Sequence, residues 1–260
     1  LASVLQQLED GWRRGGGPPL LIDLHAHILP GFDDGPETLD EALEQLRQAQ
    51  ASGIRVVVAS PHTMDTVYTA ERAQVTAAVR RLQEKLAALQ LEVTLVPGSE
   101  LHLTADPVAE LQAGTALTIN DGPYVIMELP SLQLPTFTSD ILFRLQLAGY
   151  IPLINHPERN REIQRNPAKF AALVEGGARG LLSAGSLLGD FGRRAQHAAR
   201  QLLRRGLYTC MVSDAHDLET RSFSRLLAAL QEASQIVGRK QALDLVTWRP
   251  ARILQESSSR

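Results

Sequence analysis

LLIDLHAHILPGFDDGPETLDEALEQLRQAQASGIRVVVAS (residues 20–60) holds two short apolar runs on either side of an amphipathic stretch. The runs at 20–25 and 54–60 are rich in aliphatic side chains, which is typical of strands that are buried on both faces. Between them, 38–52 repeats Leu and Ala at the i, i+3, i+4, i+7 spacing of one helix face. The stretch therefore predicts a strand, a helix and a second strand, the unit from which parallel sheets are built.

The same alternation continues to the end of the chain. Further strands are expected at 92–97, 123–129, 150–155, 179–184 and 207–213, and further helices at 70–89, 138–148, 167–175, 192–205 and 219–236. About seven strand–helix units with almost no hairpin signals predict an α/β fold, a parallel sheet closed into a TIM-like (β/α)7 barrel. An open doubly wound sheet is the alternative.

The domain limits follow from composition. Residues 20–255 are expected to form one domain, because no linker interrupts the alternation. Residues 1–19 pass through RRGGGPP and are interpreted as an N-terminal extension with a short helix and a linker. The terminal ESSSR is interpreted as a frayed tail.

Charge and composition exclude some classes of function. The chain has 260 residues, with 26 basic and 29 acidic ones and a net charge of −3, so nothing favours nucleic acid or an anionic membrane surface as the main partner. No apolar run approaches the roughly 20 residues of a membrane helix, so insertion into a membrane is not expected. The one cysteine, Cys210, excludes an intramolecular disulfide and suits a reducing compartment, so a cytoplasmic location is predicted.

Side chains that can bind metal follow the predicted strands at their C-terminal ends. In a parallel barrel these ends meet on one face, where barrel enzymes build their active sites. The side chains are His25, His27, His62, Glu100, Glu128, His156, Asp214 and His216. Five of the seven histidines belong to this layer, which favours a metal site over chance placement. His102 and His197 fall outside the pattern and are interpreted as ordinary structural residues.

The segment that begins at Asp23 supplies ligands from a strand and from a loop. His25 and His27 are two apart on a strand, so their side chains point to one side and can bind the same ion. Asp23 shares that side, and it either orients an imidazole or makes a buried structural hydrogen bond. In the following PGFDDG loop, one of Asp33 and Asp34 is expected to bind metal while the other serves the loop or caps the next helix.

Seven motifs together resemble the PHP (polymerase and histidinol phosphatase) superfamily. More narrowly, they resemble the bacterial manganese-dependent protein tyrosine phosphatases encoded with capsular and exopolysaccharide genes. In chain order they are DLHAHILPGFDDG, ASPH, PGSE, IMELP, HPERN, AGSLLGDFG and VSDAHDLETR. The resemblance covers roughly residues 20–255 and implies a distorted TIM-like barrel of the PHP type. It also implies three divalent ions, preferably manganese, with iron or zinc as alternatives.

The resemblance assigns the ligands by motif. His25, His27, Glu100 and Asp214 would hold the first ion, Glu100, Glu128 and His156 the second, and Asp34, His62 and His216 the third. Asp34 is chosen over Asp33 because the second aspartate of the family's DDG is the ligand. Arg159 of HPERN and Arg221 of DLETR match the arginines that bind phosphate, although Arg221 could instead begin a helix.

The activity that the resemblance implies is hydrolysis of phosphotyrosine on a protein. The expected partner is the C-terminal tail of a bacterial tyrosine autokinase that controls capsule and exopolysaccharide synthesis. A metal hydroxide would attack phosphorus while the arginines neutralise the phosphate oxygens. The leaving phenol has a pKa near 10 and needs little acid catalysis, and the sequence does not decide whether His216 or a metal-bound water supplies a proton.

Two other functions stay open at this point. One is a small-molecule phosphoesterase similar to histidinol phosphatase, and the other is a noncatalytic binding domain of the same fold. A thiol-based tyrosine phosphatase is not favoured, because the residue six after Cys210 is His216 and not the arginine of a Cys-x5-Arg loop. The sequence also leaves open whether the chain forms a homo-oligomer.

Overall fold

Every pairing between strands in this computed structural model is parallel, within the residues that it describes, 20–63, 67–103 and 106–258. The strands are β1 (Leu21–Ala26), β2 (Ile54–Ala59), β3 (His62–Thr63), β4 (Thr94–Pro97), β5 (Glu100–His102), β6 (Tyr124–Glu128), β7 (Ile151–Asn155), β8 (Arg179–Ser183) and β9 (Cys210–Val212). Each of the seven predicted strands coincides with one of them, so the parallel α/β architecture is confirmed. The predicted N-terminal extension, residues 1–19, lies outside the described residues.

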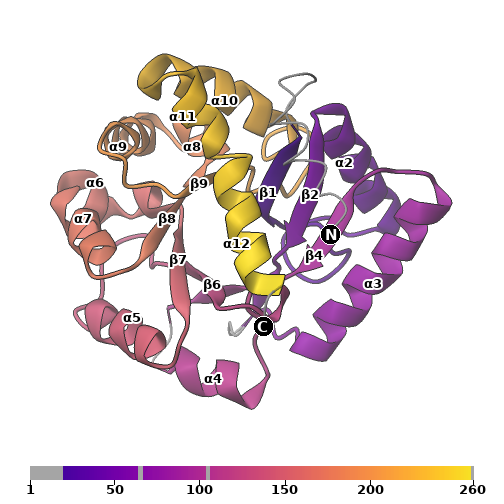
Figure 1. The fold of residues 1–260 in the computed structure, drawn as a ribbon, viewed down its shortest axis with the longest axis horizontal. Helices are drawn as coiled ribbons and strands as arrows, with labels where there is room; N and C mark the ends of the chain where they lie inside the picture. The colour runs from indigo at the N-terminus through magenta and orange to yellow at the C-terminus, as the bar shows by residue number, and fades with distance from the viewer. Residues whose placement is uncertain (1–19, 64–66, 104–105, 259–260) are drawn as a thin grey trace.

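Helices surround the strands (Figure 1). They are α2 (Leu39–Ala51), α3 (Arg72–Ala88), α4 (Pro107–Ala113), α5 (Thr138–Leu147), α6 (Arg161–Arg165), α7 (Ala168–Glu175), α8 (Ala184–Leu188), α9 (Arg193–Arg204), α10 (Ser224–Val237), α11 (Arg239–Asp244) and α12 (Trp248–Ser258), with the 3-10 turns η1 (Ile119–Asp121) and η2 (Pro157–Arg159). The cap of α2 is Thr38, whose side chain accepts from the Glu41 amide in a capping box. In the described ranges no helix combines the length and apolar character needed to cross a membrane.

The strands follow one another around a distorted ring of seven positions. One sheet has the order β1-β2-β4 and the other β3-β5-β6-β7-β8-β9. β2 and β3 are separated by Ser60 and Pro61, and β4 and β5 by Gly98 and Ser99, so each pair acts as one interrupted strand. Proline lacks the amide donor that a ladder needs, which accounts for the break before β3. A bridge between Ala26 and Ala215 joins β1 to the segment after β9.

Buried apolar side chains form two layers. The outer layer packs the strands against the surrounding helices. The inner layer joins Ile22 and Leu24 of β1, and their counterparts on the other strands, to Ile253 and Leu254 of α12. Figure 1 shows α12 lying across the ring of strands. Tyr124, the first residue of β6, donates to a carboxylate of α12, so this helix covers the N-terminal strand ends and leaves the C-terminal ends open.

The C-terminal segment is not frayed as far as it is described. The prediction for ESSSR is wrong at residues 256–258, because α12 continues to Ser258 and Ser257 is buried. A Cβ added at Gly122 would lie 2.3 Å from the Ser257 Cα, so the helix packs directly on the backbone beside η1. The tail is polar in sequence, and this glycine contact, far away in the chain, provides its packing. Residues 259–260 lie outside the description.

We expect Gly122→Ala to lower the free energy of unfolding by about 1–3 kcal/mol, the cost of forcing an extra methyl into a packed contact. Urea unfolding at one fixed metal concentration measures the change. Gly176→Ala is the matched control, because its Cβ would lie 3.4 Å from the nearest atom, the Ala172 carbonyl oxygen. Equal losses in the two variants would contradict the packing of α12 against Gly122.

Candidate metal centre

Glu100 lies at the centre of the residues predicted to bind metal. Its Oε2 atom is 3.5 Å from the Nε2 atoms of both His25 and His27, and 3.3 Å from His62 Nδ1. Its Oε1 atom is 3.7 Å from His156 Nε2. The strand register explains the meeting, because Glu100 opens β5 directly opposite His62 of β3. One buried carboxylate therefore faces four imidazoles from the ends of three strands, β1, β3 and β7.

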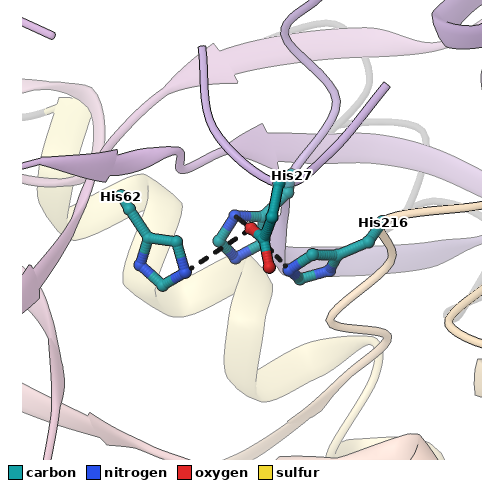
Figure 2. Close-up of side chains that lie close together, drawn as sticks. His27, His62 and His216 are labelled. Carbon is teal, nitrogen blue, oxygen red and sulfur yellow. Dashed lines mark ion pairs between the residues drawn. The ribbon is translucent and has the colours of Figure 1, made fainter. Parts of the chain in front are cut away.

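Asp34 gathers a second set of imidazoles. Its Oδ1 atom is 3.3 Å from His216 Nε2, 3.7 Å from His62 Nε2 and 3.8 Å from His27 Nδ1. Figure 2 shows the three imidazoles pointing toward one another. The four residues offer ligand atoms that all lie within 4.8 Å of one another, close enough to hold one metal ion.

The neighbouring Asp33 has a different position. Its Oδ2 atom is 2.6 Å from His27 Nδ1 and accepts from the His62 amide at 2.9 Å, while Oδ1 accepts from the Gly35 amide at 3.1 Å. A Cβ at Gly35 would lie 2.6 Å from the His27 carbonyl oxygen, so only glycine lets the loop pass there. Asp33 thus holds the loop and an imidazole, whereas Asp34 faces the three imidazoles with its Oδ1 atom.

Residues around His25 fix its orientation. Ser60 Oγ lies 2.7 Å from His25 Nδ1, which leaves Nε2 to face Glu100 and Asp214, the latter at 3.3 Å. Asp23 instead accepts from the Ser213 amide at 3.1 Å and from the Ser213 hydroxyl. Of the two roles open to Asp23, the structure shows the buried structural hydrogen bond, and Ser60 supports the imidazole.

The third group of predicted ligands joins β6 to β7. His156 Nε2 is 3.6 Å from Glu128 Oε1 and faces Glu100 as well. His156 has a φ of 32° and Asp214 a φ of 56°, a left-handed backbone that non-glycine residues rarely adopt. Such conformations persist where the surrounding structure enforces them, commonly at functional sites. Asn155 donates to Glu100 Oε1 at 2.6 Å and holds the central carboxylate in place.

The structure places His102, which the sequence assigned no role in the site, beside two of the predicted ligands. Its Nδ1 atom lies 3.1 Å from Glu128 Oε2, and its ring stacks on His62 with centroids 5.5 Å apart. Glu100 and His102 are two apart on β5, the same spacing as His25 of β1 and His27 directly after that strand. That spacing was the signal that could have found it. His197, by contrast, is an exposed residue of α9.

Arg159 and Arg221 converge on Asp214. Arg159 donates to its Oδ2 atom and, at 2.8 Å, to the Ser183 hydroxyl. Arg221 donates to Asp214 Oδ1 at 3.1 Å and reaches Asp34 Oδ2 at 3.5 Å. Helix α10 begins at Ser224, later than predicted, so Arg221 does not begin a helix. It lies in a turn whose amides donate to one oxygen of the Asp217 carboxylate.

Phe191 supports both arginines and was missed by the sequence reasoning. The guanidinium carbon of Arg159 lies 3.5 Å from the centre of the Phe191 ring, and that of Arg221 lies 5.9 Å away. Cation–π contacts of this kind hold a guanidinium in one orientation. Phe191 belongs to AGSLLGDFG, one of the seven motifs that carry the family resemblance.

The electrostatics of the cluster call for a cation. Burial raises the pKa of Glu128 to about 8, together with the negative charges of Glu100 and Asp214. Burial alone would lower the pKa of His27, but the carboxylates of Asp33 and Glu100 raise it to about 10. Buried carboxylates that repel one another, and imidazoles that compensate by taking up protons, are the groups that a divalent ion stabilises.

Unpaired atoms in the cluster fit metal ions. Among the described residues, Glu100 Oε2, His62 Nδ1 and His216 Nε2 are buried and have no hydrogen-bond partner. Because buried polar atoms are normally paired, atoms left without a partner suggest a missing ligand. His216 Nδ1 donates to the Asp214 carbonyl at 2.9 Å, which leaves Nε2 as the free ligand atom. Imidazole and carboxylate donors without thiolate suit manganese, iron or zinc.

Comparison with known proteins decides the family. A family model described as capsular polysaccharide synthesis, CpsB/CapC, matches residues 21–255. The chain belongs to the CpsB/CapC family. The family resemblance drawn from the motifs is thereby confirmed.

Among CpsB/CapC relatives, the tyrosine-protein phosphatase YwqE of Bacillus subtilis is 37% identical over 203 residues, 78% of this chain and 80% of YwqE. The putative tyrosine-protein phosphatase CapC of Staphylococcus aureus is 34% identical over 203 residues, with the same shares of the two chains. A crystal structure from work on YwqE and on CpsB of Streptococcus pneumoniae, described as unique metal-dependent tyrosine phosphatases, matches with a TM-score of 0.86. It is 34% identical, covering 91% of this chain and 95% of that one.

His102 is expected to support the metal site of this CpsB/CapC chain through Glu128. We expect His102→Ala to weaken metal affinity about 10–100-fold, the usual cost of removing a group that orients a ligand. Metal titration followed by calorimetry measures the affinity. His197→Ala is the matched histidine control, because this residue is exposed on α9. Unchanged affinity in His102→Ala would show that its contact with Glu128 does not serve the metal.

Proposed function

We propose that the protein is a metal-dependent phosphatase that hydrolyses phosphotyrosine on proteins. The observation that carries the proposal is the convergence of the buried His and carboxylate cluster with two arginines, in a chain of the CpsB/CapC family. Its relatives YwqE and CapC carry the name of tyrosine-protein phosphatase, the latter as a putative one. A noncatalytic binding domain would not need to keep every ligand position in place.

The finer parts of the proposal concern the ions and the partner. We assign three divalent ions, preferably manganese, to the three ligand sets predicted from the motifs, within a catalytic domain of residues 20–255. The protein substrate would be the C-terminal tail of a tyrosine autokinase in the cytoplasm that controls capsule or exopolysaccharide synthesis. The sets around Glu100 and Asp34 have the geometric support described above.

The residues of the chain divide the chemistry among them. Divalent ions, when bound, supply Lewis acidity and make water a nucleophile at neutral pH. Arg159 and Arg221 bind the phosphate oxygens, because a planar guanidinium matches them with two parallel hydrogen bonds. Phe191 and Ser183 hold Arg159 in position before the substrate arrives. Preorganised charge of this kind stabilises the transition state without reorganisation.

Two clefts give access to the site. One, of about 560 Å³, is lined by Asp34, His216 and Arg221, and the other, of about 610 Å³, by Arg159 and Phe191. The first cleft reaches the cluster at Asp34 and His216, and the second reaches Arg159. Burial lowers the pKa of His216 to about 4, and the charge of His27 contributes, so at neutral pH this imidazole is a neutral ligand and a poor proton donor.

The test compares substrates on the metal-loaded protein. After loading with manganese and removal of excess ions, we expect at least two ions per chain by elemental analysis. A phosphotyrosine peptide is expected to be hydrolysed faster than a phosphoserine peptide or histidinol phosphate, and EDTA is expected to abolish turnover. Preference for histidinol phosphate would instead support the small-molecule phosphoesterase, and fewer than two bound ions would contradict the metal centre.

A further inference from the structure

A groove lined with arginines leads away from the phosphate-binding Arg159. Two adjoining clefts, of about 610 and 400 Å³, form it and share four lining residues. We call this surface the arginine groove; it comprises Arg161, Gln164, Arg165, Arg193, Arg194 and His197. Arg159 and Phe191 line its inner end, so the groove is continuous with the proposed active site.

No acidic residue is among the described residues that line the two clefts of the groove. Within the described part of the chain, no carboxylate pairs with any of its four arginines, and all four are exposed. The nearest acidic residues in sequence form their ion pairs elsewhere: Glu162 pairs with Lys169, with a weaker influence from the charge of Arg165, and Asp190 pairs with Arg225. The chain as a whole carries a net charge of −3, so this concentration of positive charge is local.

Two of the arginines occupy an unfavourable place in a helix. Arg193 and Arg194 form the start of α9, whose cap is Gly192 without a capping side chain. The helix dipole disfavours cations at this end and favours anions. Arg161 and Arg165 lie one turn apart on α6, roughly 6 Å along its axis. In an extended peptide, residues two apart are separated by about the same distance, so two such side chains could each face one of these arginines.

We propose that the arginine groove binds the carboxylate side chains of an acidic segment flanking the phosphotyrosine of the substrate. The proposal rests on the proposed function, because the phosphate must occupy Arg159 for the flanking segment to reach the groove. Guanidinium groups pair with carboxylates through two parallel hydrogen bonds. The N-terminus of α9, which has no capping side chain, adds a positive electrostatic potential that attracts carboxylates. The groove therefore selects substrates by the charge beside the tyrosine.

The experiment uses pairs of phosphotyrosine peptides that differ only in glutamate or glutamine on the N-terminal or the C-terminal side. For the metal-loaded enzyme we expect the kcat/KM of a glutamate peptide to be at least about fivefold higher than that of its glutamine counterpart, the size of effect that a few exposed charge pairs give. The difference is expected in KM. The preference is expected to shrink as NaCl is raised, because salt screens exposed charges. Arg193→Ala/Arg194→Ala is expected to lose the preference while hydrolysing 4-nitrophenyl phosphate at the normal rate.

The matched control is Arg204→Ala/Arg205→Ala, which removes two exposed arginines from the other end of α9 and is expected to keep the preference. Arg193→Glu/Arg194→Glu is expected to favour lysine-flanked peptides. Equal kcat/KM for glutamate and glutamine peptides in the unaltered enzyme, or a preference that survives in Arg193→Ala/Arg194→Ala, would overturn the groove proposal alone. Failure to hydrolyse any phosphotyrosine peptide would overturn the proposed function instead.

Discussion

The Glu100→Gln variant is expected to lose roughly a thousandfold or more in kcat/KM for a phosphotyrosine peptide. Its carboxylate is buried and lies between four imidazoles, so no other side chain can replace its charge at the centre of the cluster. Metal ions contribute several kcal/mol to the stabilisation of a transition state, and each 1.36 kcal/mol is a factor of ten in rate. Glutamine keeps the shape and can keep the contact with Asn155, so the change removes the charge and one acceptor oxygen.

Elemental analysis decides why the activity is lost. We expect Glu100→Gln to retain at least one ion fewer per chain than the unaltered protein, with the same circular dichroism spectrum. Glu84→Gln, an exposed change on α3, is the matched control and is expected to alter neither metal content nor rate. Full metal content together with full activity in Glu100→Gln would remove Glu100 from the metal centre.

The strands could be predicted where apolar runs were long enough. β2 has six residues, all aliphatic except Arg55, and the structure confirms it. β3 and β5 have two and three residues, and a proline or a glycine interrupts the strand before each of them. A hydrophobic periodicity cannot be recognised in segments of two or three residues. The final helix was missed because its end is polar in sequence, and its burial depends on the distant Gly122.

The sequence predicts that the metal-binding side chains lie together at the C-terminal ends of the strands, but it does not predict which of them contact one another. Strand ends brought Glu100 and the histidines together as the parallel topology requires. The different positions of Asp33 and Asp34 depend on contacts with His27 and His216, which no local pattern encodes. Phe191 lies on a loop, and its stacking on Arg159 joins two separate segments of the chain. Side-chain contacts across the fold are therefore what the sequence could not supply.

Arg159→Lys is expected to lower kcat/KM for a phosphotyrosine peptide about a hundredfold while leaving the metal content unchanged. Lysine keeps the positive charge beside Asp214. It cannot donate in two parallel bonds to phosphate, and it cannot both reach the Ser183 hydroxyl and stack flat on Phe191 as the guanidinium does. The loss should therefore appear in kcat as well as in KM.

Steady-state kinetics and elemental analysis on the same preparation separate phosphate binding from metal binding. Arg252→Lys, an exposed change on α12, is the matched control and should behave as the unaltered enzyme. A fall of less than about threefold in Arg159→Lys would mean that charge alone is sufficient there. Phe191→Leu alone should lower the rate. Combined with Arg159→Lys it should cause little further loss, because the effects of substitutions at two residues in contact are not additive. Independent, additive losses would show that Phe191 does not act through Arg159.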